Sequence, residues 1–230
     1  MRLLFVASDP MEFRGLLASI EKPQQACSTA EWARSGKLGA HEVFLSANGA
    51  GWRCAAAAVD SAYSAFHPDA VISTGFCGAL DPQLKIADVV AATRIMPCGA
   101  RASALPPSFR TVESGPVVSI DHVVQTAEEK RALYAQGAIA VEMEAAGVAE
   151  RAQALGLPFY CVRAVTDPAS EDMANDFNAA LRPDGHFDTM LVFRHALRHP
   201  VARLPELIRL RRNCERAART LGEFFADCRF

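Results

Sequence analysis

The sequence predicts an α/β fold in which helices pack against a central sheet. Short apolar runs of strand length, such as residues 3–7 and 159–165, alternate with helical segments such as the alanine-rich stretch 52–66. Runs that are apolar throughout are typical of strands covered on both faces. The chain has 230 residues, half of them hydrophobic, which is enough for one sizeable core. We therefore expect a single domain over residues 1–230.

The first half of the chain predicts strands that end in turns. Asp9 is suited to cap a helix that follows the first strand, with Pro10 at the first helical position. Glycine-containing turns follow the later strands, and open α/β sheets bind their ligands at such carboxyl ends. We expect strands at 3–7, 41–47 and 70–74, helices at 11–20 and 52–66, glycine turns at 48–51 and 75–79, and a loop with an edge strand over 21–40.

The second half continues the alternation and then becomes helical. Thr166-Asp167-Pro168 ends the last apolar run, and a residue before proline avoids helical backbone, so Asp167 is expected in extended chain at a strand end. Residues 168–230 are expected to form a helical C-terminal extension. We expect strands at 87–95, 117–124 and 159–165, a long irregular excursion at 96–116, and helices from about Met143 to Leu155, at 188–197 and at 205–228.

Composition excludes several functions. The net charge of -2 shows no polyanion-binding signature, so no nucleic-acid partner is expected. The seven cysteines contain no C-x-x-C pair and the six histidines are scattered, so no metal site is expected. No run reaches the roughly 18 apolar residues of a membrane span, and we expect a cytoplasmic protein. The last helix is basic and amphipathic. This is typical of a packing helix with a solvated basic face, and docking on an anionic membrane is the alternative.

The segment Glu142-Met143-Glu144 lies between the apolar run 138–141 and an alanine-rich helical segment. Acidic residues at a helix start suit the helix dipole, so a simple helix start is one interpretation. A sugar-binding site is the other. A carboxylate can accept hydrogen bonds from two adjacent hydroxyls, and methionine offers an apolar surface to a sugar face. The residues by themselves leave both interpretations open.

Taken together, several segments resemble the purine nucleoside phosphorylase and nucleosidase family, most closely its methylthioadenosine/S-adenosylhomocysteine nucleosidases. They are the first strand with its turn ending at Glu12, Ser73–Gly78, Ala140–Ala145 and Val162–Asp167. The resemblance implies a three-layer nucleoside phosphorylase-like fold with a central mixed, twisted sheet flanked by helices. It also implies cleavage of a ribose–purine N-glycosidic bond. The hopanoid-associated branch of the family is a further expectation, suggested by the basic tail.

The resemblance also implies roles for individual residues. Asp167 would protonate the departing purine, and burial beside other carboxylates would raise its pKa. Glu12 would activate water, Glu144 would bind the ribose hydroxyls, and Met143 would pack on the sugar. The remaining implied positions are Gly75, Phe76, Cys77, Gly78, Val123, Val124 and Glu142 for substrate binding, and Arg163 and Thr166 as supporting residues.

The choice between water and phosphate rests on the first turn. Phosphorylases of this family typically carry Gly-Asp-Pro-Leu-Arg there, and the arginine binds phosphate. This chain has Ser8-Asp9-Pro10-Met11-Glu12, and a carboxylate repels phosphate but can act as a general base toward water. Phosphorylases also use an arginine and a serine that flank the second glycine turn, and the matching positions here are Ser73 and Phe76, so the expected phosphate ligands are absent. We therefore expect hydrolysis. Phosphorolysis is the alternative, with phosphate contacts from Arg14, Arg94, Arg101 or Arg110.

A nucleoside-binding protein without catalytic activity is an alternative from a different class, because folds are reused for many functions. Against it stands the joint presence of Glu12, Glu144 and Asp167. The resemblance implies no cofactor. The expected partners are a small-molecule nucleoside of adenosine type with a 5′ substituent, and a second copy of the chain in a homodimer.

Overall fold

The computed structural model describes residues 1–105 and 110–228. The strands are β1 (Arg2–Ala7), β2 (Glu21–Gln25), β3 (Trp32–Leu38), β4 (His41–Ala47), β5 (Ala70–Ala79), β6 (Val89–Met96), β7 (Glu113–Ser119), β8 (Ala140–Glu142) and β9 (Phe159–Asp167). The helices are α1 (Arg14–Ser19), α2 (Trp52–Phe66), α3 (Ala127–Ala135), α4 (Ala145–Ala154), α5 (Thr189–Ala196) and α6 (Pro200–Asp227), with short 3₁₀ turns η1 (Pro10–Phe13) and η2 (Asn178–Ala180).

The strands form one mixed sheet in the order β2-β3-β4-β1-β5-β8-β7-β6-β9. β1 pairs in parallel with β4 and β5, and β5 also pairs in parallel with β9. Because β9 pairs with β6 as well, β5, β8, β7, β6 and β9 close into a ring of strands. The parallel strands β1, β5 and β9 point their carboxyl ends the same way, where open α/β sheets bind ligands.

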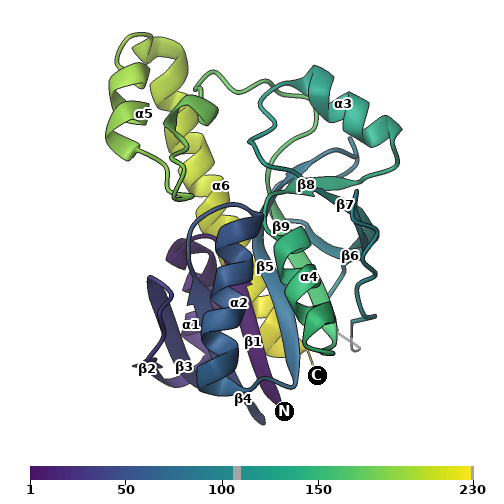
Figure 1. Cartoon of the computed structure of the whole chain (residues 1–230). Helices are drawn as coiled ribbons and strands as arrows, with labels where there is room; N and C mark the ends of the chain where they lie inside the picture. The colour runs from purple at the N-terminus through teal and green to yellow at the C-terminus, as the bar shows by residue number, and fades with distance from the viewer. Residues whose placement is uncertain (106–109, 229–230) are drawn as a thin grey trace.

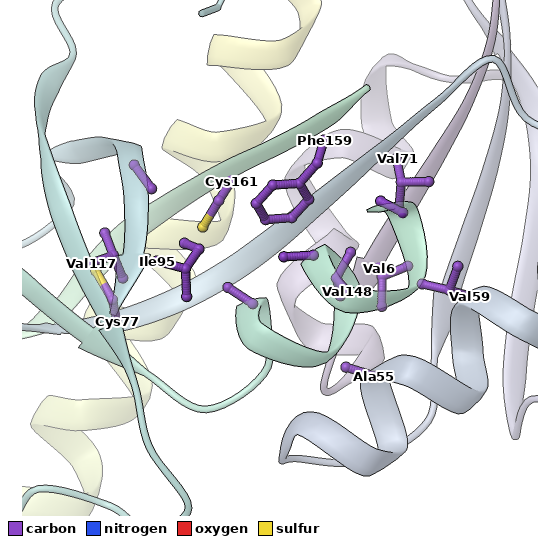
Figure 2. Close-up of a cluster of buried hydrophobic side chains, with 14 of the residues drawn as sticks. Val6, Ala55, Val59, Val71, Cys77, Ile95, Val117, Val148, Phe159 and Cys161 are labelled. Atoms are coloured by element: carbon purple, nitrogen blue, oxygen red, sulfur yellow. The ribbon is translucent and has the colours of Figure 1, made fainter. Parts of the chain in front are cut away.

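Helices cover both faces of the sheet, as the sequence predicts (Figure 1). On one face, Val6, Val71 and Phe159 of the strands pack with α2 and α4, and Figure 2 shows this cluster. On the other face, α1 and α6 pack over β1, where the rings of Phe5 and Phe225 lie 5.0 Å apart. The apolar face of α6 is thus a packing surface, which is the first of the two interpretations of that helix.

Some elements differ from the expectations. The segment 21–40 forms two strands, β2 and β3, where a loop with one edge strand was expected. The residues of β2 are exposed and polar, so this edge strand shows no apolar alternation in the sequence. Residues 75–79 continue β5 and pair with β9 and, at the end of the strand, with β8, so the expected glycine turn is wrong. The strand expected at 117–124 is β7, which begins at Glu113 and ends at Ser119. Helix α3 was not expected, because the run of four charged residues at 128–131 interrupts its apolar spacing.

Several boundaries also move. Asp9 and Pro10 begin a helix as expected, but its first four residues form η1. The helix expected from Met143 starts at Ala145, and α6 begins at Pro200, five residues before the expected start. Part of the excursion expected at 96–116, residues 106–109, lies outside the described residues. No helix in the described part of the chain is long and apolar enough to cross a membrane.

Candidate active site

A cavity of about 540 Å³ lies at the carboxyl ends of the parallel strands. Its lining includes Glu12, Glu144 and Asp167, which are distant in sequence. The fold brings them together because the chain leaves β1, β8 and β9 at this edge. Of the expected site residues, Phe76, Cys77, Gly78, Val123, Val124, Glu142, Met143 and Thr166 also line the cavity, whereas Gly75 and Arg163 lie behind its wall.

Glu12 is fixed by the turn that follows β1. The Asp9 side chain caps η1, and Glu12 Oε2 accepts hydrogen bonds from the Ser8 and Asp9 backbone N–H groups at 2.8 and 3.0 Å. Its other oxygen accepts from the Phe76 N–H at 2.7 Å. Burial raises the pKa of Glu12, whereas the positive charge of Arg163 and these hydrogen bonds oppose the rise. The carboxylate is therefore held in one place at the cavity wall and can accept a proton.

Arg163 lies fully buried beneath the cavity and organises its carboxylates. One guanidinium nitrogen donates to the Thr74 carbonyl at 2.8 Å, and the other donates to Ser73 Oγ at 2.6 Å. The guanidinium also pairs with Glu142 and, at 3.4 Å, with Glu144. A buried charge needs such partners, because desolvation penalises it heavily. The expected pairing of Glu142 with Arg163 is present.

Of the two interpretations of the Glu142-Met143-Glu144 segment, the helix start applies to Glu142 and the ligand site to Glu144. Glu142 Oε2 accepts hydrogen bonds from the N–H groups of Glu144 and Ala145 at 3.0 and 2.8 Å, so it serves the start of α4. Glu144 turns toward the cavity and accepts from the Gly51 N–H at 3.0 Å. Burial raises the pKa of Glu144 to about 7, with Arg163 opposing the rise. Glu144 is thus the carboxylate available to a ligand.

Asp167 ends β9 in extended backbone, as expected, and faces the same cavity. Of the carboxylates expected beside it, Glu171 acts on its pKa, and a lysine that was not expected lies closer. Asp167 Oδ2 accepts a hydrogen bond from Lys130 Nζ at 2.6 Å, and Thr166 Oγ1 lies 3.1 Å from Asp167 Oδ1. Burial is the main cause that raises the pKa of Asp167, and Lys130 opposes it, with only a small further rise from Glu171.

The glycines of β5 allow these carboxylates to approach the strand. At Gly75, φ is +130°, and a Cβ there would overlap the Glu12 carboxylate. At Gly78, a Cβ would lie 2.9 Å from Asp167 Oδ2. Glu12 thus contacts β5 at Phe76 and Asp167 contacts it at Gly78, two residues or about 7 Å further along the strand.

The expected base-binding backbone at Val123 already has a partner. Asn178 of η2 accepts from the Val123 N–H at 2.8 Å and donates to its carbonyl at 2.9 Å. His122 lines the cavity beside it, between Asp121 and Glu129 at 3.0 and 2.8 Å. Hydrogen bonds to these carboxylates, Asp121 first, raise the pKa of His122. A ligand in this part of the cavity would lie beside a histidine whose pKa is raised.

The wall opposite the strands is apolar. It is built by the chain after β9, including α5 and the first half of α6. These segments place no charged side chain among the described lining residues of the cavity. The larger apolar side chains of this wall are Met173, Phe177, Phe187, Phe193, Leu207 and Leu210.

Sequence reasoning missed Lys130, Asn178 and most of this apolar wall. For Lys130 a weak signal exists, since Ala127, Lys130 and Leu133 are spaced three apart and lie on one helical face. A lysine on the otherwise apolar face of a helix needs a buried partner. For Asn178 and the wall, no local pattern identifies the contacts.

Comparison with known proteins gives a family and a set of relatives. A family model described as the phosphorylase superfamily matches residues 3–110 and 99–184. A 5′-methylthioadenosine/S-adenosylhomocysteine nucleosidase of Staphylococcus saprophyticus is 29% identical and aligns with 69% of this chain and 83% of its own. Its counterpart in Staphylococcus aureus strain JH9 is also 29% identical, over 64% of this chain and 78% of its own.

Solved structures share the fold. A nucleosidase of the same name from S. pneumoniae, in complex with a transition-state inhibitor, superposes with a TM-score of 0.71 at 21% identity and covers 99% of both chains. The futalosine hydrolase of Helicobacter pylori has a TM-score of 0.69 at 18% identity, over 97% of this chain and 95% of its own. At these identities the likeness shows the fold alone.

Proposed function

The chain belongs to the phosphorylase superfamily, and on that premise we propose that it hydrolyses the ribose–purine N-glycosidic bond of an adenosine-type nucleoside. One observation carries the proposal. A buried carboxylate from the β1 turn, Glu12, and a second from the end of β9, Asp167, line one cavity together with Glu144. An N-glycosidase needs an acid for its leaving group, a base for its nucleophile and a group that holds the sugar.

Asp167 acts on the leaving group. As the C1′–N9 bond breaks, its electron pair moves into the purine, and Asp167 donates a proton to N7 so that a neutral base departs. Burial favours the protonated carboxyl, as the raised pKa of Asp167 indicates. The carboxylate that remains faces the Lys130 ammonium at 2.6 Å.

Glu12 acts on the nucleophile. It takes a proton from water as the water oxygen attacks C1′, and free sugar is the second product. Glu12 and Asp167 contact β5 at two different residues, Phe76 and Gly78, so they enter the cavity from different points, as an acid and a base on either side of a sugar require. Glu144 accepts hydrogen bonds from the ribose hydroxyls, and Met143 packs on the sugar face.

The lining of the cavity supports hydrolysis over phosphorolysis. Among the described residues that line it there is no arginine or lysine. Arg110, one of the arginines considered for phosphate, pairs instead with Glu223 and Asp227 at 2.9 and 2.7 Å. A phosphate dianion beside Glu12 and Glu144 would face like charges, with no arginine or lysine among the described lining residues to offset them.

The apolar wall supports a large apolar 5′ substituent. The polar groups of the cavity lie on the strand side, where they suit the base and the ribose. The wall built by α5 and α6 carries aromatic and aliphatic side chains, which suit an alkyl or lipid-like group better than the charged amino acid of S-adenosylhomocysteine. A hopanoid substituent remains one prediction within this class.

A product assay tests the proposal. Adenosine, inosine, 5′-methylthioadenosine, S-adenosylhomocysteine and 5′-octylthioadenosine are each incubated with the protein, with and without phosphate, and free base and sugar are quantified. We expect free adenine and unphosphorylated sugar, at a rate independent of phosphate and highest for the octylthio compound. A rate proportional to phosphate, with sugar 1-phosphate as product, would establish a phosphorylase instead. Binding without turnover of any compound would establish a nucleoside-binding protein.

The chain's assembly is a separate proposal. We expect a homodimer, and light scattering coupled to gel filtration measures it directly. Membrane docking is an alternative use of the exposed side chains Met190, Phe193 and Leu197 of the α5 region, which lie beside Arg194 and Arg198. Co-sedimentation with anionic vesicles tests that alternative.

A further inference from the structure

Lys130 is fully buried in the first half of α3. Its ammonium donates to Asp167 Oδ2 at 2.6 Å and to the Pro168 carbonyl at 2.8 Å. A lysine is almost never fully buried unless it is paired, because desolvation of its charge is costly. Lys130 does not line the cavity, so it reaches a ligand only through Asp167.

Contacts other than those of Lys130 also hold α3 in place. Thr126 caps the helix by accepting a hydrogen bond from the Glu129 N–H at 3.2 Å. The Ala127 N–H donates to Asp172 at 2.6 Å, which ties the start of the helix to the chain after β9. An apolar side chain at position 130 would satisfy packing at lower cost. Packing alone therefore does not explain a charged residue at position 130, and its contact with Asp167 is the feature that an apolar residue would lack.

The other groups around Asp167 supply no comparable cation. They are the thiols of Cys77 on β5 and Cys214 on α6, and the carboxylate of Glu171 after β9. Glu171 is itself paired with Arg209 at 2.8 Å. Within the described residues, the ammonium of Lys130 is thus the charge that opposes the rise in the pKa of Asp167 caused by burial.

Resting on the function proposed above, we propose that Lys130 is a positioning residue for the acid step. It holds Asp167 Oδ2, which leaves Oδ1 to face the purine, and its charge stabilises the carboxylate that remains after proton transfer. The O–H bond of Asp167 breaks, the N7–H bond forms, and the C1′–N9 electron pair stays on the purine. Lys130 keeps its own protons throughout. Without it, the acid is weaker and less well oriented.

The variant Lys130→Met tests this role, with Arg131→Met as the matched control, because Arg131 is the exposed neighbour on the same helix. Two substrates are compared: the best purine nucleoside of the panel, and 4-nitrophenyl riboside, whose phenolate departs without needing a proton. We expect Lys130→Met to lower kcat on the purine nucleoside about 100-fold or more and to change the nitrophenyl reaction less than about threefold. Equal losses on both substrates would overturn the proposal.

The pH profile provides a readout that a structural role would not move. Removing the ammonium should raise the pKa of Asp167, so the alkaline limb of kcat/KM should move to higher pH in Lys130→Met and stay in place in Lys130→Arg. An unmoved limb in Lys130→Met would contradict the proposal. If that variant does not fold, Lys130→Gln, which keeps a donor without a charge, replaces it in every arm.

A measurement that needs no turnover separates this proposal from the proposed function. Carboxyl ¹³C NMR follows the titration of Asp167, assigned by its absence in Asp167→Asn. We expect a higher pKa for Asp167 in Lys130→Met than in the wild-type protein. If this shift appears but no nucleoside is cleaved, the proposed function fails and the Lys130–Asp167 coupling stands. If the shift is absent, the inference fails whatever the activity.

Discussion

Replacing Arg163 with methionine removes the positive charge that the buried carboxylates Glu12, Glu142 and Glu144 share. Methionine is apolar and similar in length, so it limits any cavity left behind. The main cost is electrostatic. Breaking a buried pair by removing one partner costs about 3–5 kcal/mol, because the other charge is left unpaired in a medium that solvates it poorly. In a chain of this size that loss corresponds to a fall in Tm of about 6–20 °C.

The loss should depend on pH. Burial raises the pKa of Glu144 to about 7 and also raises that of Glu12, so both carboxyls take up protons as the pH falls. When fewer of these carboxyls are ionised, removing the positive charge of Arg163 costs less free energy of unfolding. The destabilisation by Arg163→Met should therefore be larger at about pH 8 than at about pH 5.5. Urea unfolding at both values measures it.

Arg151→Met is the matched control, because Arg151 also pairs with a carboxylate, that of Asp60, but both side chains are partly exposed. Its loss should be about 0–1 kcal/mol at either pH. The reasoning would be refuted if Arg163→Met cost less than about 1 kcal/mol at the higher pH, or if its cost did not change with pH.

Further predictions concern the carboxylates and the strand that carries them. Asp167→Asn should reduce purine release at least 100-fold but leave nucleoside binding by calorimetry within about tenfold, and unchanged turnover would remove Asp167 as the acid. Glu12→Gln should abolish hydrolysis in the assay of purine release, and adding phosphate should not restore the activity. The raised pKa of Glu144 favours folding below its unfolded value of 4.5, and that contribution is lost as the pH rises through about 7, so Glu144→Gln should raise Tm more at pH 8 than at pH 5. Equal shifts at both pH values would contradict this sign. Gly75→Ala should lower Tm and activity together, whereas Gly39→Ala, also at positive φ but with nothing near its Cβ, should lower Tm only slightly.

Much of the site could be read before the fold was known, because its chemistry is carried by local segments. Glu12 lies in a turn, Glu144 at a strand-to-helix step and Asp167 before a proline, and all three line one cavity. Their catalytic roles stay predictions. Gly75 shows the limit of such reasoning. It was expected in a turn, but it lies inside β5, where the missing Cβ leaves room for the Glu12 carboxylate.

Elements with a local sequence pattern could be predicted from the chain alone. The apolar runs of β1, β4 and β9 and the alanine-rich α2 were found within a residue or two, because burial on both faces and helical spacing leave a signal along the chain. Three features became visible only in the folded chain: the pairing of β5 with β9, the apolar wall from α5 and α6, and the contact of Lys130 with Asp167. These contacts join segments far apart in sequence, and the role of a buried charge can be understood only once its partner is known.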